Sequence, residues 1–231
     1  MKAKDVSHDR RRAESKPDPA ALPRGPHKLS REFVVRSQRD RLLDAMAEAC
    51  ATRGYTRVTV ATVTKRAGVS RKTFYDLFSD REDCFLQAYD AILAKFLGRV
   101  IGAYERPAHD WADRLRAAIK ALLAFLAAEP AFARMCLVEV LSAGERAMER
   151  YLSAVRLLAG LLDEGRAMNP PPSELPDGTA LAVIHGCALV LREQIMAGRT
   201  AELTELLPDL LYAALVAYVG QEQALAHAYG D

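Results

Sequence analysis

Residues 58–85 decide the fold, and they read VTVATVTKRAGVSRKTFYDLFSDREDCF. This stretch predicts two short helices separated by a tight turn. Thr59 is a suitable N-cap for the first helix, and Gly68 follows that helix at the position where a left-handed residue is favoured. Ser70 can cap the second helix, which we expect over residues 71–78 and call the reading helix.

The reading helix keeps its polar side chains away from its apolar stripe. Its first turn carries Arg71 and Lys72, although a helix N-terminus disfavours cations because of the helix dipole. A polyanion bound at this end would remove the unfavourable interaction. The pattern is that of a helix-turn-helix whose second helix enters the major groove of DNA.

A third helix is expected directly after the reading helix. Ser79 and Glu82 fit a capping box, so we expect Ser79 to cap a helix that runs to about residue 103. Such a helix is roughly 30 Å or more long at 1.5 Å per residue. It can therefore connect an N-terminal head with the rest of the chain. The preceding helix, which supports the head, is expected over residues 37–53.

The same stretch resembles the signature of the tetracycline-repressor (TetR) family. The resemblance is carried by Thr59, Val60, Val63, Ala67-Gly68-Val69-Ser70, Thr73-Phe74-Tyr75, Phe78, Asp80-Arg81-Glu82-Asp83 and Phe85. Thr64 stands where the family usually has alanine, and its hydroxyl is expected to bond back to the preceding turn. The resemblance implies DNA contacts from Arg71, Lys72, Thr73 and Tyr75, with Thr59 and Arg81 at flanking phosphates.

The composition predicts an all-α protein. Half of the 231 residues are apolar, and the chain has little of the alternating pattern that is typical of strands. We expect a disordered basic tail over residues 1–30 and a helix-turn-helix DNA-binding domain over residues 31–82. A helical effector-binding and dimerisation domain would then occupy residues 83–231.

The charge is distributed unevenly along the chain. Residues 1–80 contain 18 Lys and Arg against 10 Asp and Glu, a balance of +8, and residues 81–231 contain 14 against 20, a balance of −6. A basic front and an acidic back suit a DNA-binding head on a body that does not touch DNA. The arginines of residues 10–12 favour a solubilising tail. For the basic residues between 24 and 36, a contact with DNA and a solvated tail are equally open.

The sequence gives little support for catalysis, a metal or a membrane span. The cysteines Cys50, Cys84, Cys136 and Cys187 are far apart, so we expect reduced thiols and neither a zinc site nor a disulfide framework. The histidines are scattered without a nucleophile beside them, and no phosphate-binding loop is present. We therefore predict no metal, no cofactor and a cytoplasmic protein without a secretory signal or a membrane-spanning segment.

An effector pocket is expected in the body. Met and aromatic side chains form adaptable apolar walls, but the same side chains also make ordinary cores. The candidate pocket residues are Trp111, Phe125, Phe132, Met135, Met148, Tyr151 and His185. For His185, a hydrogen-bonded core histidine is the favoured interpretation, and a ligand-sensing group is the alternative. The expected ligand is a small apolar or amphipathic molecule.

The last two helices carry wide apolar stripes at heptad-like spacing. They can bury these stripes within one chain, or pair across a two-fold axis into a four-helix bundle. The resemblance favours the second arrangement. The candidate interface residues are Leu181, Ile184, Ala188, Leu191, Ile195, Leu207, Leu211 and Leu215.

The resemblance implies a homodimeric transcriptional regulator that binds double-stranded DNA at a palindromic operator. In that family the regulator is most often a repressor that a small-molecule effector releases. Two alternatives stay open at this stage: a DNA-binding regulator without an effector, and an all-α enzyme with an appended DNA-binding head.

Overall fold

The computed structural model describes residues 30–168 and 175–230, and throughout these residues the regular elements are helices. The expected basic tail, apart from Ser30, lies outside the described residues, as do residues 169–174 and 231. The α-helices and 3-10 helices are α1 (Arg31–Arg53), η1 (Tyr55–Arg57), α2 (Val60–Ala67), α3 (Arg71–Leu77), α4 (Arg81–Tyr104), α5 (Trp111–Ala128), α6 (Pro130–Leu137), η2 (Glu139–Ser142), α7 (Glu145–Asp163), α8 (Gly165–Met168), α9 (Thr179–Met196), η3 (Thr200–Leu206) and α10 (Leu207–Tyr229).

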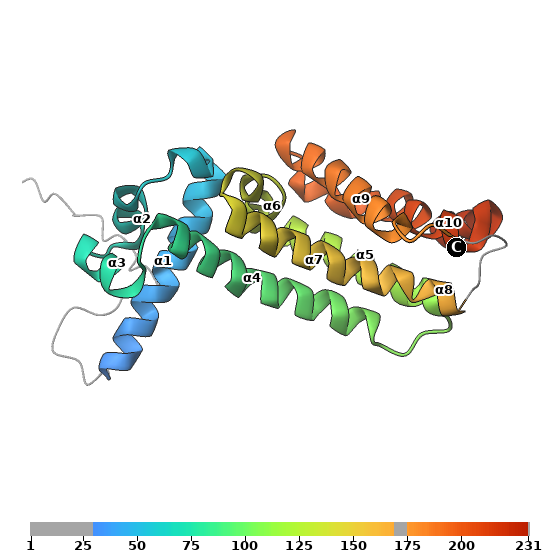
Figure 1. The fold of residues 1–231 in the computed structure, drawn as a ribbon, viewed down its shortest axis with the longest axis horizontal. Coiled ribbons are helices and arrows are strands. Elements are labelled where there is room, and N and C mark those ends of the chain that lie inside the picture. The colour runs from blue at the N-terminus through green and yellow to red at the C-terminus, as the bar shows by residue number, and fades with distance from the viewer. Residues whose placement is uncertain (1–29, 169–174, 231) are drawn as a thin grey trace, which may run out of the picture.

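The helices form a head and an elongated body (Figure 1). The head consists of α1, α2 and α3, and α4 runs from the head to the far end of the body. With 24 residues, α4 is about 36 Å long. α5 packs on α4, α7 packs on α9, and α10 packs on both α5 and α9. The all-α prediction is confirmed.

The local signals in the head produce the expected turns. Thr59 caps α2 by accepting a hydrogen bond from the backbone N–H of Thr62, and Gly68 ends α2 with φ 63° and ψ 37°. Ser70 caps α3 in the same way from the N–H of Thr73. The hydroxyl of Thr64 donates to the backbone oxygen of Ala61, as expected for a buried threonine on this helix.

Two helix starts differ from the prediction. α1 begins at Arg31, earlier than the expected start at residue 37, because Ser30 caps it by accepting from the N–H of Phe33. α4 is capped by Asp80 and not by Ser79, since the Asp80 carboxylate accepts from the N–H of Asp83 at 2.8 Å. A carboxylate is the stronger acceptor at the positive end of the helix dipole.

The last two helical stretches are apolar and poorly covered. Residues 179–196 and 200–229 are long and apolar enough to cross a membrane by length and composition, and only 17% and 33% of their apolar windows are buried. Two such helices are weak evidence for a membrane span, because helices that pack in the core of other proteins have the same composition. What the low burial does show is that one copy of the chain leaves apolar surface on these helices without a partner.

Candidate functional site

The first turn of α3 presents exposed basic side chains. Arg71, Lys72 and Tyr75 are exposed, and Tyr75 has 58% of its surface open to solvent. Phe74 on the opposite side is fully buried and packs against Phe78 with ring centroids 5.4 Å apart. The buried face fixes the helix to the head, so the exposed face is free to meet a groove of DNA.

Two of the remaining candidate DNA contacts lie in the first turn or at the cap of a helix. The hydroxyl of Thr73 lies 2.9 Å from that of Ser70, the α3 cap, and Thr59 caps α2. Both threonines lie at a helix N-terminus, where backbone N–H groups favour phosphate. Their contacts with DNA stay predictions.

Arg81 faces the interior of the head. Its guanidinium lies over the ring of Tyr55 at 4.3 Å and donates to the backbone oxygen of Val58 at 2.8 Å. The side chain therefore ties the start of α4 to the segment between α1 and α2. A phosphate contact from Arg81 stays a prediction, and the sequence motif alone does not reveal this inward role.

The body contains an apolar cavity of about 120 Å³. Its walls come from α4, α5, α6, α7, α9 and α10. The lining side chains are Tyr89, Leu93, Phe96, Leu115, Ile119, Leu122, Leu126, Phe132, Cys136, Leu137, Tyr151, Ala154, Val155, Leu158, Leu162, Ile184, Cys187, Ala188, Leu191, Leu210 and Ala214. Leucine is the commonest residue among them, so a search for methionine and aromatic residues missed most of the wall.

The candidate pocket residues fall into two groups. Phe132 and Tyr151 line the cavity. Phe125 is buried behind Phe132 with ring centroids 5.3 Å apart, so it supports the wall. The others lie away from the cavity lining: Trp111, Met135, Met148 and His185. His185 is exposed on α9, and Trp111 packs against Tyr218 at the far end of the body.

The candidate interface residues also fall into groups with different surroundings. Ile184, Ala188 and Leu191 line the cavity. Four are buried or partly buried within the chain: Ile195, Leu207, Leu211 and Leu215. Leu181 is 39% exposed, and the other large exposed apolar side chains on α9 are Leu189, Val190 and Met196. Leu181 is thus the one exposed member of the predicted set on α9, and the predicted interface residues stay predictions.

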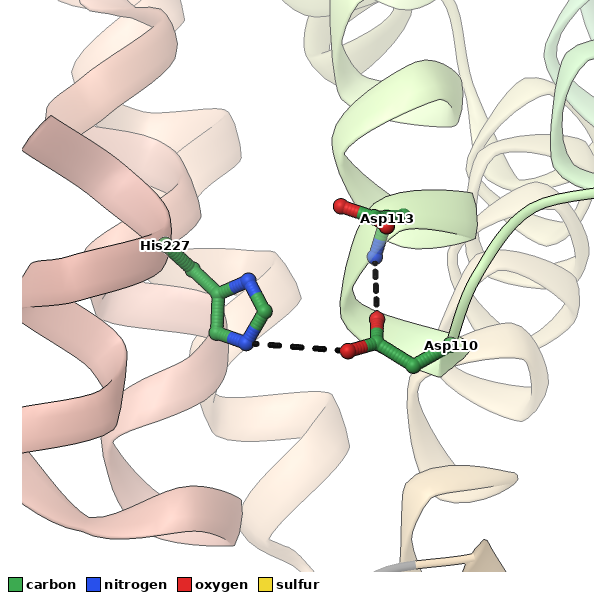
Figure 2. Close-up of side chains that lie close together, drawn as sticks. All are labelled: Asp110, Asp113 and His227. Carbon is green, nitrogen blue, oxygen red and sulfur yellow. Dashed lines mark hydrogen bonds and ion pairs between the residues drawn. The ribbon is translucent and has the colours of Figure 1, made fainter. Parts of the chain in front are cut away.

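A cluster of potential metal ligands joins α5 and α10 (Figure 2). One ligand atom from each of Asp110, Asp113 and His227 lies within 4.8 Å of the others. Asp110 makes both contacts drawn in Figure 2: it caps α5 by accepting from the N–H of Asp113 at 2.9 Å, and it lies 3.9 Å from the His227 ring. The positive end of a helix dipole disfavours a bound cation, so helix capping accounts for this arrangement better than a metal does.

Comparison with known proteins identifies the head. The family model described as bacterial regulatory proteins of the tetR family matches residues 42–88. These residues span α2 and α3, together with the end of α1 and the start of α4. The chain is a regulator of the TetR family. It is a DNA-binding transcriptional regulator with the helix-turn-helix head that this family uses. No curated protein matches the chain at a significant level.

Solved structures of TetR-family regulators have the same fold over head and body. The fatty acid degradation regulator FadR of Bacillus halodurans has a TM-score of 0.69 at 22% identity, covering 77% of this chain and 94% of its own. FadR of Bacillus subtilis in complex with stearoyl-CoA has a TM-score of 0.67 at 21% identity, covering 78% and 98%. A TetR-family regulator of Marinobacter aquaeolei has a TM-score of 0.61 at 18% identity, covering 78% and 97%. At these identities the likeness establishes the fold.

Proposed function

We propose that this TetR-family regulator is a cytoplasmic homodimeric repressor, and that an apolar or amphipathic small molecule releases it from a palindromic operator. The cavity in the body carries this proposal. Its wall includes α4, whose first residue, Arg81, belongs to the head. A ligand that displaces this wall would change the spacing of the two reading helices, which must stay near one DNA turn, about 34–36 Å, or a multiple of it.

The chemistry of the cavity favours binding over catalysis. Its polar groups belong to Tyr89, Cys136, Tyr151 and Cys187. Burial raises the pKa of each of these groups, so all four stay neutral near pH 7. Uncharged walls bind apolar groups and offer no acid–base pair, which argues against the enzyme alternative.

The size of the cavity implies that a long ligand moves the walls. An engineered apolar cavity of about 150 Å³ in another protein holds benzene, so about 120 Å³ accommodates a group of similar size. A longer chain fits only if helices shift outward. Such a ligand must bind the DNA-free form more tightly than the DNA-bound form, because equal affinity for both would shift nothing.

A surface groove beside the cavity suits the polar end of an amphipathic ligand. The groove lies between α4 and α7, and Leu93 and Ala154 line both the groove and the cavity. Its other side chains include Glu149, Arg150 and Ser153. The stearoyl-CoA bound by the B. subtilis regulator is a molecule of this amphipathic class, and we extend that class to this chain as part of the proposal.

The exposed stripe on α9 supports the proposed dimer. Leu189 and Met196 are about 60% exposed, at 62% and 59%. Large apolar patches on a protein surface are typical of interaction sites. Pairing α9 and α10 with the same helices of a second copy would cover this stripe in an isologous interface.

The test combines operator selection with ligand release. DNA fragments bound by the full-length protein are first selected from the host genome, and release is then measured with fatty acids and acyl-CoA esters of increasing chain length. We expect release to strengthen with chain length. In Ala154→Leu, which fills the cavity, release should be lost while ligand-free operator binding persists.

The matched control is Ala124→Leu, which adds the same side chain at an exposed position on α5. This variant should respond like the wild type. If Ala154→Leu is released as readily as the wild type, the cavity is not the effector site. If no member of the series releases the wild type, the alternative of a regulator without an apolar effector gains support.

A further inference from the structure

A buried carboxylate joins the body to the head. Glu139 opens η2, directly after α6, and is 6% exposed. Its Oε2 accepts a hydrogen bond from the backbone N–H of Tyr55 at 2.7 Å, although the two residues are 84 positions apart. Its Oε1 lies 3.1 Å from Nε of Arg134 on α6, as an ion pair without hydrogen-bond alignment.

The accepting end of this hydrogen bond belongs to the body and the donating end to the head. Tyr55 begins η1, the segment that connects α1 with α2. Its ring packs against Phe85 of α4 at 4.8 Å and under the guanidinium of Arg81 at 4.3 Å. Tyr55 is thus the point at which α1, α2 and α4 meet, and Glu139 is the body residue that holds its backbone.

The residue before Tyr55 is shaped for this approach. Gly54 has φ 77°, a conformation that side chains with a Cβ rarely adopt, and a Cβ there would lie 3.4 Å from Oε2 of Glu139. Glycine is therefore favoured by the backbone turn, while a Cβ would meet Glu139 only at an ordinary contact distance.

The helix that leads into Glu139, α6, also lines the cavity. Phe132, Cys136 and Leu137 of α6 are wall residues, and Glu139 follows α6 by two positions. Figure 1 shows α6 at the end of the body that adjoins the head. If α6 moves as a unit, displacement of its cavity face displaces Glu139, and a shift of about 1 Å takes a 2.7 Å hydrogen bond beyond its useful range.

We propose that Glu139 is a positioning residue for operator binding: its hydrogen bond to Tyr55 holds the head in the DNA-binding orientation, and displacement of α6 breaks it. Glu139 would act through Tyr55 and without touching DNA. The coupling to α6 rests on the proposed effector cavity, whereas the effect on DNA binding stands on the head–body contact alone.

Three substitutions at Glu139 separate hydrogen bonding from charge. Glu139→Gln keeps an acceptor at the same reach and removes the charge. Glu139→Asp keeps the charge but withdraws the acceptor by one methylene, and Glu139→Ala removes both. We expect operator affinity to fall about tenfold or more in the Asp and Ala variants and to stay near the wild-type value in the Gln variant.

The readouts are operator affinity of the full-length protein and hydrogen exchange at the Tyr55 amide. Exchange at this amide, measured relative to amides within α1, should accelerate in the Asp and Ala variants only. The control is Leu123→Ala, a buried position on α5 outside the cavity lining, which should lower stability without changing either readout. If the Ala variant does not fold, the Asp and Gln pair decides the question.

The proposal is overturned if folded Glu139→Asp binds the operator like the wild type, or if Glu139→Gln is as impaired as Glu139→Asp. Stearoyl-CoA serves as the probe for the coupling to the cavity. It should accelerate Tyr55 exchange in the wild type and have little further effect in the Asp variant. If stearoyl-CoA neither binds the wild type nor releases it from the operator, the proposed effector class is wrong. The operator affinities and exchange rates of the Glu139 variants still test the role of Glu139.

Discussion

Gly165 in α8 is closely packed against Trp111, and this packing permits a prediction of known sign. A Cβ added at Gly165 would lie 2.4 Å, 2.5 Å and 2.8 Å from three ring atoms of Trp111. Ordinary contacts of this kind begin near 3.4 Å, so the ring or α8 must move by about 1 Å. Trp111 is 2% exposed, packs against Tyr218 at 5.4 Å and donates from Nε1 to the backbone oxygen of Leu161 at 3.3 Å.

Gly165→Ala should therefore destabilise the protein by about 1–3 kcal/mol, the range for an overpacked core. The helix propensity of alanine opposes this effect by at most about 1 kcal/mol. The matched control is Gly160→Ala, at an exposed position in α7 where a Cβ meets nothing within 4 Å. At that position only the difference in helix propensity matters, so the free energy of unfolding of the variant should rise by about 0.5–1 kcal/mol.

Urea unfolding at one fixed protein concentration measures both variants. Trp111 is the only tryptophan of the chain, so its fluorescence reports on this contact, and circular dichroism reports on the helices. A fixed concentration is needed because the stability of a dimer depends on it. In a thermal unfolding experiment at the same protein concentration, the melting temperature of Gly165→Ala should lie roughly 2–12 °C below that of the wild type. A Gly165→Ala variant as stable as the wild type would refute the packing argument.

Three further perturbations have defined outcomes. Replacing both Arg71 and Lys72 with alanine should weaken operator binding and reduce its salt dependence, and a folded double variant that binds like the parent would rule out α3 as the reading helix. Leu189→Glu should give folded monomers at micromolar concentration by sedimentation, whereas a glutamate at an exposed leucine of α7 should not. Burial raises the pKa of Cys50 and Cys84 from 9.0 to about 12, so these thiols ionise earlier in the unfolded chain. Stability should consequently fall as pH rises above about 9, by about 1.4 kcal/mol per pH unit for each thiol, and a flat unfolding free energy between pH 9 and pH 11 would contradict this.

The head could be predicted because its signals are local. The caps at Thr59 and Ser70 act over three residues, and Gly68 adopts a conformation that its own type favours. The inward position of Arg81 could not be predicted in the same way, since it depends on Tyr55, which comes from another segment. The motif places Arg81 correctly in the chain but does not tell in which direction its side chain points.

The cavity could not be predicted from the sequence for a related reason. Its wall combines side chains from six helices, and the commonest among them are leucines whose spacing is that of any core-facing helix. Whether such side chains meet or leave a space depends on how the helices cross. The Glu139 contact is equally non-local, because nothing near residue 139 in the sequence indicates that the N–H of Tyr55 lies beside it.

The heptad spacing on α9 predicts an apolar helix but does not tell which side of it faces outward. A helix that is apolar on more than one side has more than one surface to bury. Ile184 and Leu191 line the cavity, and Leu189 and Met196 belong to the exposed stripe. α9 thus separates the cavity from the proposed dimer interface with a single layer of backbone. If both proposals hold, an effector that displaces α9 also acts on the affinity between subunits, and by reciprocity the partner subunit acts on the affinity for the effector.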